Sequence, residues 1–342
     1  MLSTIFMLGL SVAQAEEPPP VISGANYRAV LIPAGVTKIG CTSDKVTDCV
    51  MAVRKKKKEE RGKAVYYSKA KVEQPFYIME TEVTRQLWQE VFPEMKKKEY
   101  AIDRVFCTSN CPVEGISWLA AADFANQLSK KEGLEQCYNL DPLYGNAINT
   151  LVSSIEGNTD LEGTMNIMES IWNRDCNGWR LPTAVEWEYA ARGGENYKYA
   201  GSDSKGAVAV KSRFRKLTFG DLAVSAEGIV LAPLILPIHR LLFYAPFGGP
   251  RSVCSKQKNG YGLCDMSGNM QEWVWDWTYQ DTYAYGKSYK SMMMLTVKGS
   301  SYSQVSTYKR SHFVWTQHRY PLIGIFDPDV TEDAGFRLVR NP

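Results

Sequence analysis

The stretch Asn259 to Trp277, NGYGLCDMSGNMQEWVWDW, decides the fold. Its first part carries turn signals, because Gly260 and Gly262 tolerate positive φ and the short polar side chains of DMSGN bond readily to their own backbone. Three tryptophans then alternate with other residues over Trp273–Trp277. A period of two with large aromatic side chains is typical of a β-strand. We predict two tight turns followed by a strand.

The same stretch carries a possible metal chemistry. Asp265 and Glu272 are hard oxygen donors, and the chain between them turns at Gly268-Asn269. Such a loop aims carboxylates and backbone carbonyls at one point, which suits Ca²⁺. The alternative is a solvated turn whose acidic side chains face water, and spacing alone leaves both open.

Composition narrows the class of protein. The 342 residues allow one large domain or two modest ones, and 44% hydrophobic with 23% charged residues is typical of a globular chain. A net charge of +3 gives no argument for nucleic acid as a partner. The basic run RKKKKEERGK at 54–63 is interpreted as a solvated segment, with docking on an anionic surface as the alternative.

The N-terminal residues predict export. The apolar run Ile5–Val12 precedes Ala13-Gln14-Ala15, an A-x-A cleavage pattern, so residues 1–15 are predicted to be a signal peptide. Residues 16–26 are predicted to be a polar, proline-rich tether, and the sequence contains no later run of apolar residues long enough for a transmembrane helix. We expect a periplasmic or secreted protein.

The eight cysteines agree with export, since an even number predicts disulfides in an oxidising compartment. Pairing neighbours in sequence gives Cys41–Cys49, Cys107–Cys111, Cys137–Cys176 and Cys254–Cys264. Zinc is the alternative, but no C-x-x-C pair occurs and the three histidines lie far from any close cysteine pair.

The remaining elements are short. We predict strands in 27–40, 72–79, 295–302 and 334–339, and helices that begin near Thr84, at an N-cap Ser117 and at a capping box of Thr183 and Glu186. Gly133 and Gly193 are predicted to end the last two helices. Residues 141–177 and 202–250 are interpreted as insertions. The sum is one α+β domain over 27–342, with long loops and little regular secondary structure.

Long blocks of this sequence resemble the formylglycine-generating enzyme (sulfatase-modifying factor) family. The matching blocks are IPAGVTKIG, FYIMETEVTRQLWQ, CPVEGISWLAAADFANQL, GWRLPTAVEWEYAARGG, NGYGLCDMSGNMQEWVWDW, KGSSY and AGFRLVR, spread between Tyr27 and Arg340. The resemblance implies a variant of the C-type lectin fold. It also implies a structural Ca²⁺ held by the side chains of Asp265 and Glu272 and the carbonyls of Gly268 and Met270.

The activity of that family does not transfer. Members that oxidise a substrate cysteine bind copper(I) with two cysteines in a GGSY-x-C-x₄-C pattern, and the corresponding positions here are Gln304 and Lys309. An amide and an ammonium do not replace two thiolates, and no cysteine follows Cys264. The iron-dependent branch of the family needs an H-x₃-H-x-E motif that this sequence lacks. We therefore expect no bound copper and no family active site.

The segment after the lost cysteines is the candidate binding groove. It is rich in the aromatic and basic residue types of binding hot spots. The predicted groove residues are Tyr302, Gln304, Lys309, Arg310, His312, Trp315, His318 and Arg319. The alternative is a loop whose aromatic side chains cover the core. A mouth formed by Lys309, Arg310 and Arg319 favours an acidic partner.

The sequence therefore predicts an exported, non-catalytic binding or accessory protein for a protein or glycan partner. One alternative is an oxidase or other metal-dependent oxidoreductase that uses a different site. Another is a displayed ligand-binding protein with a variable lectin-type face. Neither the partner nor the oligomeric state follows from the sequence.

Overall fold

The computed structural model describes residues 21–41, 67–94, 109–144, 161–210, 249–284, 287–302, 317–321 and 333–342. The predicted signal peptide and the predicted groove positions 304–315 lie outside these ranges, as does most of the predicted insertion at 202–250.

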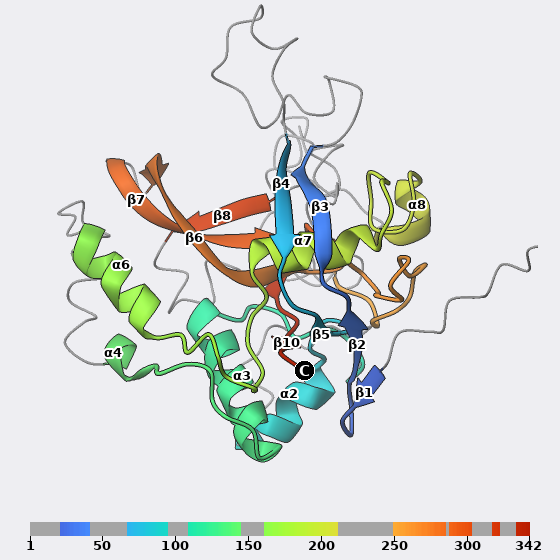
Figure 1. Cartoon of the computed structure of the whole chain (residues 1–342), viewed down its shortest axis with the longest axis horizontal. Coiled ribbons are helices and arrows are strands. Elements are labelled where there is room, and N and C mark those ends of the chain that lie inside the picture. Colours follow the sequence, from blue (N-terminus) through green and yellow to red (C-terminus); the bar gives the residue numbers. More distant parts are fainter. Residues whose placement is uncertain are drawn as a thin grey trace, which may run out of the picture.

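Both ends of the described chain meet in one antiparallel sheet (Figure 1). Its strand order is β1 (Val21–Ser23), β2 (Arg28–Ile32), β5 (Phe76–Met79) and β10 (Val339–Arg340). Val30 pairs with Ile78, and Ile78 pairs in turn with Val339. Strand β1 lies inside the predicted tether and pairs with β2, so the tether prediction is wrong for residues 21–23.

A separate two-stranded ribbon forms from β3 (Gly35–Gly40) and β4 (Tyr67–Val72). The single strand predicted over 72–79 is therefore two strands, β4 and β5, separated by Glu73-Gln74-Pro75. Proline lacks the N–H that a continuous ladder would need, which explains the break.

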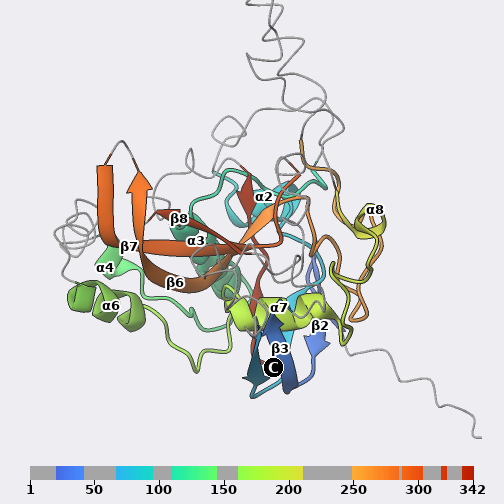
Figure 2. The same ribbon diagram turned by 90° about the horizontal axis from the view of Figure 1, so that it is seen from above.

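The C-terminal sheet has the order β8 (Gln317–Pro321), β7 (Lys287–Lys298), β6 (Gln271–Ala284) and β9 (Ala334–Gly335). Strands β6 and β7 form a long antiparallel hairpin, and β9 joins β6 in parallel (Figure 2). The predicted strand at 273–277 is confirmed as part of β6. The predicted strand at 334–339 is divided between β9 and β10, which belong to different sheets.

The helices begin where the sequence places their caps. The described helices are α2 (Arg85–Val91), α3 (Trp118–Lys131), α4 (Asp141–Tyr144), α6 (Leu161–Ser170), α7 (Ala184–Arg192) and α8 (Lys205–Val208). Thr84, Ser117 and Thr183 each accept a backbone N–H at the first turn, and Thr183 and Glu186 complete the capping box. Gly193 is the C-cap of α7 with φ 62°, as predicted. The C-cap of α3 is instead Glu132, and Gly133 follows directly after it.

The tryptophans of β6 lie in the core between the sheet and α3. Trp273 and Val274 are fully buried, and Trp275 is nearly so, which means that β6 is covered on both faces over these three residues. Trp273 donates from its indole to the carbonyl of Ile116 (2.7 Å), and Trp118 donates to the carbonyl of Val274 (3.1 Å). These bonds allow large polar-tipped aromatic rings to be buried.

Two disulfides have the pairing expected from sequence, Cys137–Cys176 and Cys254–Cys264. Cys41 and Cys111 are also disulfide-bonded, and their expected partners, Cys49 and Cys107, lie outside the described residues. Among the described helices, none combines the length and the apolar character needed to span a bilayer.

Candidate functional site

The loop that precedes β6 is shaped by left-handed backbone conformations. Gly262 (φ 80°), Asp265 (φ 56°), Gly268 (φ 102°) and Asn269 (φ 65°) all have positive φ. Glycine adopts this region freely, and Asp and Asn are the side-chain-bearing residues that tolerate it best. The DMSGN segment therefore turns sharply enough to present its carbonyls and side chains to the interior.

Glu272 lies at the centre of this region, and Arg337 holds it. The Arg337 guanidinium donates from Nε and Nη2 to the two Glu272 oxygens, at 2.7 Å each, and both side chains are fully buried. The indole of Trp187 donates to the same carboxylate at 2.7 Å. Arg337 also donates to the carbonyls of Glu80 (3.1 Å) and Cys264 (2.9 Å). A bidentate, fully hydrogen-bonded pair of this kind is geometrically rigid.

Two further buried carboxylates lie near this pair. Glu82 accepts hydrogen bonds from the N–H of Met270 (3.0 Å) and from the side-chain amide of Asn269 (2.9 Å), so it stabilises the turn at Gly268-Asn269. Burial, together with the negative charges of Asp265 and Glu272, raises the pKa of Glu82 well above its ordinary value. Asp265 accepts the N–H of Cys254 at 2.6 Å through Oδ2, whereas its Oδ1 is buried and has no hydrogen-bond partner among the described residues.

The two carboxylates predicted to bind calcium differ in how well they suit an ion. Asp265 fits, because its buried Oδ1 is free to accept a cation. Glu272 does not fit, because Arg337 already neutralises its charge and engages both of its oxygens. Within the described ranges, the acidic groups Glu82, Asp265 and Glu272 are not among the sets of three potential ligands within 4.8 Å of one another. Calcium binding is therefore a prediction from the sequence resemblance alone, and the contacts of Glu272 favour the opposite outcome.

The segment that the family resemblance aligns with the copper-binding motif begins directly beside this loop. Gly268 donates its N–H to the carbonyl of Gly299 (2.8 Å), and the N–H of Tyr302 is donated to the carbonyl of Asn269 (2.8 Å). Ser301 donates from its hydroxyl to Asp333, which also accepts from the amide of Gln271 at 3.2 Å. The GSSY segment is thus fixed to the turn, and Tyr302 is buried rather than displayed. This burial leaves little of the Tyr302 side chain for a partner to contact, and its assignment to the groove stays a prediction.

The other predicted groove residues are only partly placed. His318 and Arg319 lie in β8, where they pair with Val297 and Thr296 of β7. The remaining positions, Gln304, Lys309, Arg310, His312 and Trp315, are outside the described residues. The groove prediction for these residues therefore stays a prediction.

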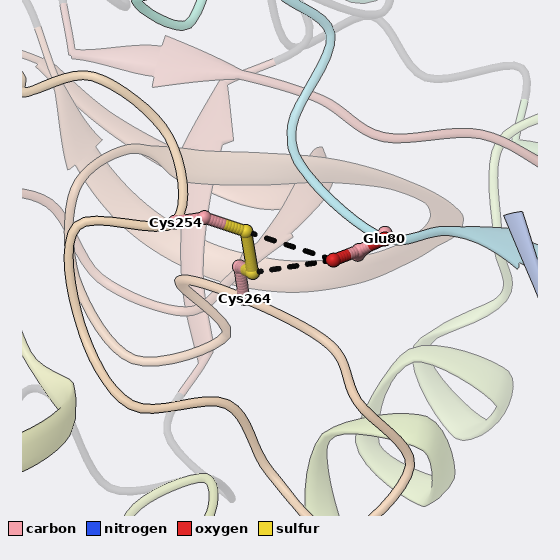
Figure 3. Close-up of side chains that lie close together, drawn as sticks. All are labelled: Glu80, Cys254 and Cys264. Carbon is pink, nitrogen blue, oxygen red and sulfur yellow. Dashed lines mark hydrogen bonds between the residues drawn. A yellow bond between two sulfur atoms is a disulfide. The ribbon is translucent and has the colours of Figure 1, made fainter. Parts of the chain in front are cut away.

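Sequence reasoning missed Glu80, which lies next to the Cys254–Cys264 disulfide (Figure 3). One Glu80 carboxylate oxygen lies 3.9 Å from each of the two sulfurs. Glu80 belongs to the block FYIMETEVTRQLWQ, and the sequence pattern of this block indicates no role for its acidic residues. Glu82 of the same block and Arg337 of AGFRLVR were missed in the same way, because nothing in their sequence spacing links them to the β6 loop.

A polar cleft of about 530 Å³ is a second feature that the sequence did not indicate. Its lining includes the side chains of Asp123, Gln127, Gln136, Asn139, Asp141 and Asn173. The structure gives the Gln136 amide and the Asp141 carboxylate no hydrogen bond to another described residue. The cleft therefore offers uncommitted donors and acceptors to a polar ligand.

An α+β domain with these turns, a buried Arg–Glu pair and a GSSY segment fixed to them defines a sulfatase-modifying-factor-like protein. Residues 14–342 match the family model described as "Sulfatase-modifying factor enzyme 1-like domain", and the chain belongs to this family.

Two curated proteins are similar to this chain. "Chaperone protein LppX" of Paenibacillus barcinonensis is 28% identical over 82% of this chain and 85% of its own length. "Formylglycine-generating enzyme" of Mycobacterium tuberculosis is 32% identical over 31% of this chain and 28% of its own length.

Solved structures share the fold. "Treponema denticola variable protein 1" has a TM-score of 0.55 at 21% identity, with 94% of this chain and 99% of that chain covered. PvdO from Pseudomonas aeruginosa has a TM-score of 0.51 at 15% identity, with 96% and 100% covered. At these identities the likeness supports the fold, including the expected lectin-like variant, and nothing about activity.

Proposed function

We propose that this chain is an exported accessory protein that binds a protein partner and assists its folding, without oxidising cysteine. The observation that carries the proposal is the replacement of the family's copper-binding cysteines by Gln304 and Lys309, with no cysteine after Cys264. Every described cysteine is disulfide-bonded, so no described thiol offers a substitute. Export is supported by the disulfides and by the predicted signal peptide.

The direction of the proposal comes from the relative named as a chaperone. That similarity extends over most of both chains, whereas the similarity to the formylglycine-generating enzyme covers less than a third of each. A scaffold that keeps its rigid turn and buried charges while its thiolate pair is absent suits binding rather than catalysis.

The catalytic alternative is tested with copper and oxygen. Purified protein is loaded with copper(I), and oxygen uptake is measured with a cysteine-containing peptide as substrate. We expect no stoichiometric copper after dialysis and no oxygen uptake. Retained copper together with peptide-dependent oxygen uptake would contradict the proposal and support a metal-dependent oxidoreductase instead.

The accessory role is tested by aggregation of a thermally unfolding client, citrate synthase, followed by light scattering. We expect equimolar protein to suppress scattering, with serum albumin as the inert control. The double variant K309E/R310E tests whether the basic mouth of the predicted groove binds acidic client segments, and K69E/K71E on the exposed face of β4 is the charge-matched control. Full scattering in the presence of the wild-type chain would contradict the proposal.

A glycan is the second candidate ligand, and the polar cleft favours it. Sugar hydroxyls both donate and accept hydrogen bonds, which amide and carboxylate side chains satisfy. The probe is an array of bacterial and plant oligosaccharides, and a positive signal is expected to fall in the double variant Q136A/D141N. Binding that is unchanged in this variant would exclude the cleft.

A further inference from the structure

The group formed by Glu80, Cys254 and Cys264 has no role in the function proposed above. In the described part of the chain, it is the set of three potential ligands whose donor atoms all lie within 4.8 Å of one another. Figure 3 shows the Glu80 carboxylate directed at the midpoint of the disulfide, 3.9 Å from each sulfur. Glu80 and Cys264 are buried, and Cys254 is partly exposed.

The backbone positions of these residues do not depend on the disulfide alone. Cys264 donates its N–H to the carbonyl of Glu80 at 2.9 Å, and its own carbonyl accepts from Arg337. Cys254 donates its N–H to Asp265, and its neighbour Val253 donates to the carbonyl of Asn110 at 3.0 Å. The three side chains would therefore stay close together after the sulfur–sulfur bond is broken.

The geometry suits a tetrahedral zinc ion. Zinc–sulfur bonds of about 2.3 Å and zinc–oxygen bonds of about 2.1 Å place tetrahedral ligand atoms roughly 3.6–3.8 Å apart. The Glu80 oxygen is already at nearly this distance from both sulfurs, at 3.9 Å. Only the sulfurs must separate, and Cys254 is on a loop near the surface. Three protein ligands leave the fourth position for water.

A metal ion would have to compete with the positively charged side chains that now contact Glu80. Glu80 forms ion pairs with Lys258 and with Arg28, whose side chains are 48% and 60% exposed. Exposed ion pairs contribute little, whereas zinc–thiolate binding contributes much more, so a metal displaces Lys258 from the carboxylate.

We propose that reduction of the Cys254–Cys264 disulfide creates a zinc site formed by the two thiolates and the Glu80 carboxylate. A dithiol reductant gives two electrons and two protons to the disulfide and is itself oxidised to a disulfide. A phosphine gives two electrons and leaves as its oxide, and water supplies the oxygen and the two protons. Either reaction converts the Cys254–Cys264 disulfide to two thiols. Zinc binding then releases these two protons to solvent. In the oxidised protein the sulfurs are bonded to each other and the site does not exist. This proposal does not rest on the accessory function proposed above.

The test uses the full chain under anaerobic conditions. Limited phosphine treatment should open this disulfide before Cys137–Cys176, because Cys254 is partly exposed whereas Cys137 and Cys176 are fully buried. Alkylation followed by mass spectrometry identifies which cysteines have been reduced. After removal of the reductant, Co²⁺ is added as a spectroscopic probe and Zn²⁺ as a competitor. We expect one Co²⁺ per chain with a thiolate-to-cobalt charge-transfer band, its loss on Zn²⁺ addition, and metal protection of Cys254 and Cys264 from alkylation. The oxidised protein should give no band.

Variants assign the ligands. E80Q is expected to weaken Co²⁺ binding at least tenfold, and E73Q, an exposed carboxylate at the end of β4, is the control that should not. C254S alone should abolish the band, and because Cys254 is near the surface this variant is expected to fold, which circular dichroism verifies. A folded, reduced wild type without a band would overturn the proposal, as would a full band in C254S. Equal affinities in E80Q and wild type would remove Glu80 from the site.

Discussion

At the scale of single residues, the buried charge depends on Arg337. Its guanidinium donates hydrogen bonds to the Glu272 carboxylate and to the carbonyls of Met79, Glu80 and Cys264. Arg337→Lys keeps the charge but loses the bidentate contact, so part of this buried network is left unsatisfied. We expect a loss of about 3 kcal/mol or more in the free energy of unfolding, measured by urea denaturation.

The control for this prediction is Lys71→Ala, which removes an exposed ion pair with Glu73. It should change the same free energy by at most about 1 kcal/mol. The double variant R337M/E272Q should be more stable than R337M alone, because it leaves no uncompensated buried charge. If R337K unfolds like the wild type, the guanidinium is not the stabilising element.

Glu186 gives the prediction for pH. Burial alone would raise the pKa of this carboxyl, but the charge and hydrogen bonds of Arg180 and the bonds from Thr183 outweigh burial and hold the pKa below its ordinary value. A pKa that is lower in the folded state stabilises the protein above the unfolded pKa of about 4.5. This stabilisation is lost as the pH falls through the folded value. As the pH falls below about 4.5, the thermal midpoint of E186Q should therefore decrease less steeply than that of the wild type. Equal slopes of midpoint against pH for the two proteins would contradict this prediction.

At this scale, the sequence predicts residues with local signatures. Thr183, Glu186 and Gly193 were placed correctly because a capping box and a left-handed cap depend only on neighbouring residues. The contact between Glu272 and Arg337 spans 65 residues and carries no spacing signal. Asp265 and Glu272 were therefore assigned to a common ion when the fold provides Glu272 with a guanidinium.

At the scale of elements, two glycines at helix ends form a matched pair. Gly133 follows α3 with φ 70°, and Gly193 follows α7 with φ 62°. A Cβ at Gly133 would meet no atom within 4 Å, whereas one at Gly193 would lie 2.7 Å from the backbone nitrogen of Gly260. Gly133→Ala should lower the free energy of unfolding by about 1 kcal/mol through φ alone, and Gly193→Ala by roughly 3 kcal/mol because the β6 loop must also move.

This comparison is measured by chemical denaturation of both variants. Equal losses of unfolding free energy in the two variants would show that Gly260 moves aside at little energetic cost. The close approach of Gly193 to Gly260 would then not contribute to the effect of the substitution. Circular dichroism should remain unchanged for both proteins, since each substitution lies outside the helix itself.

The disulfides give a second prediction for elements. Cys137–Cys176 closes a sequence separation of 39 residues, and Cys254–Cys264 closes one of 10. On the chain-entropy account, their removal costs about 4 and about 3 kcal/mol respectively. Replacing each pair by serine should therefore destabilise the first variant more, as read from thermal midpoints. The reverse order would mean that the loop beside Glu80 depends on its disulfide for more than chain entropy.

Strand boundaries show where periodicity fails as a guide. The alternation of Trp273, Trp275 and Trp277 predicts a strand, but Val274 between them is also fully buried. Packing by α3 on one side and α7 on the other removes the exposed face that an alternating pattern implies. Similarly, residues 334–339 are predicted as one strand, yet the chain leaves the C-terminal sheet after Gly335 and enters the N-terminal sheet at Val339.

At the scale of the whole molecule, the fold was predictable because its blocks are long and extend over nearly the whole chain. The residues between Tyr302 and β8, where the sequence places a groove, belong to none of these blocks, so the resemblance does not predict what they bind. The GSSY segment itself shows the limit. Its sequence suggests a groove wall, whereas hydrogen bonds to Asn269 and Asp333 turn it inward and bury Tyr302.

The last prediction concerns calcium. It distinguishes neutralisation of the buried carboxylates by a bound ion from neutralisation by Arg337. A family-type ion would bind Glu272 and Asp265, but Arg337 already supplies the positive charge at Glu272. We expect the thermal midpoint to be the same in EDTA and in millimolar Ca²⁺, because an ion must displace a fully hydrogen-bonded guanidinium. A ligand present at 100 times its dissociation constant would stabilise the fold by about 2.7 kcal/mol. A rise of the corresponding size, abolished in D265N, would show that Asp265 binds the ion and that Arg337 moves to admit it.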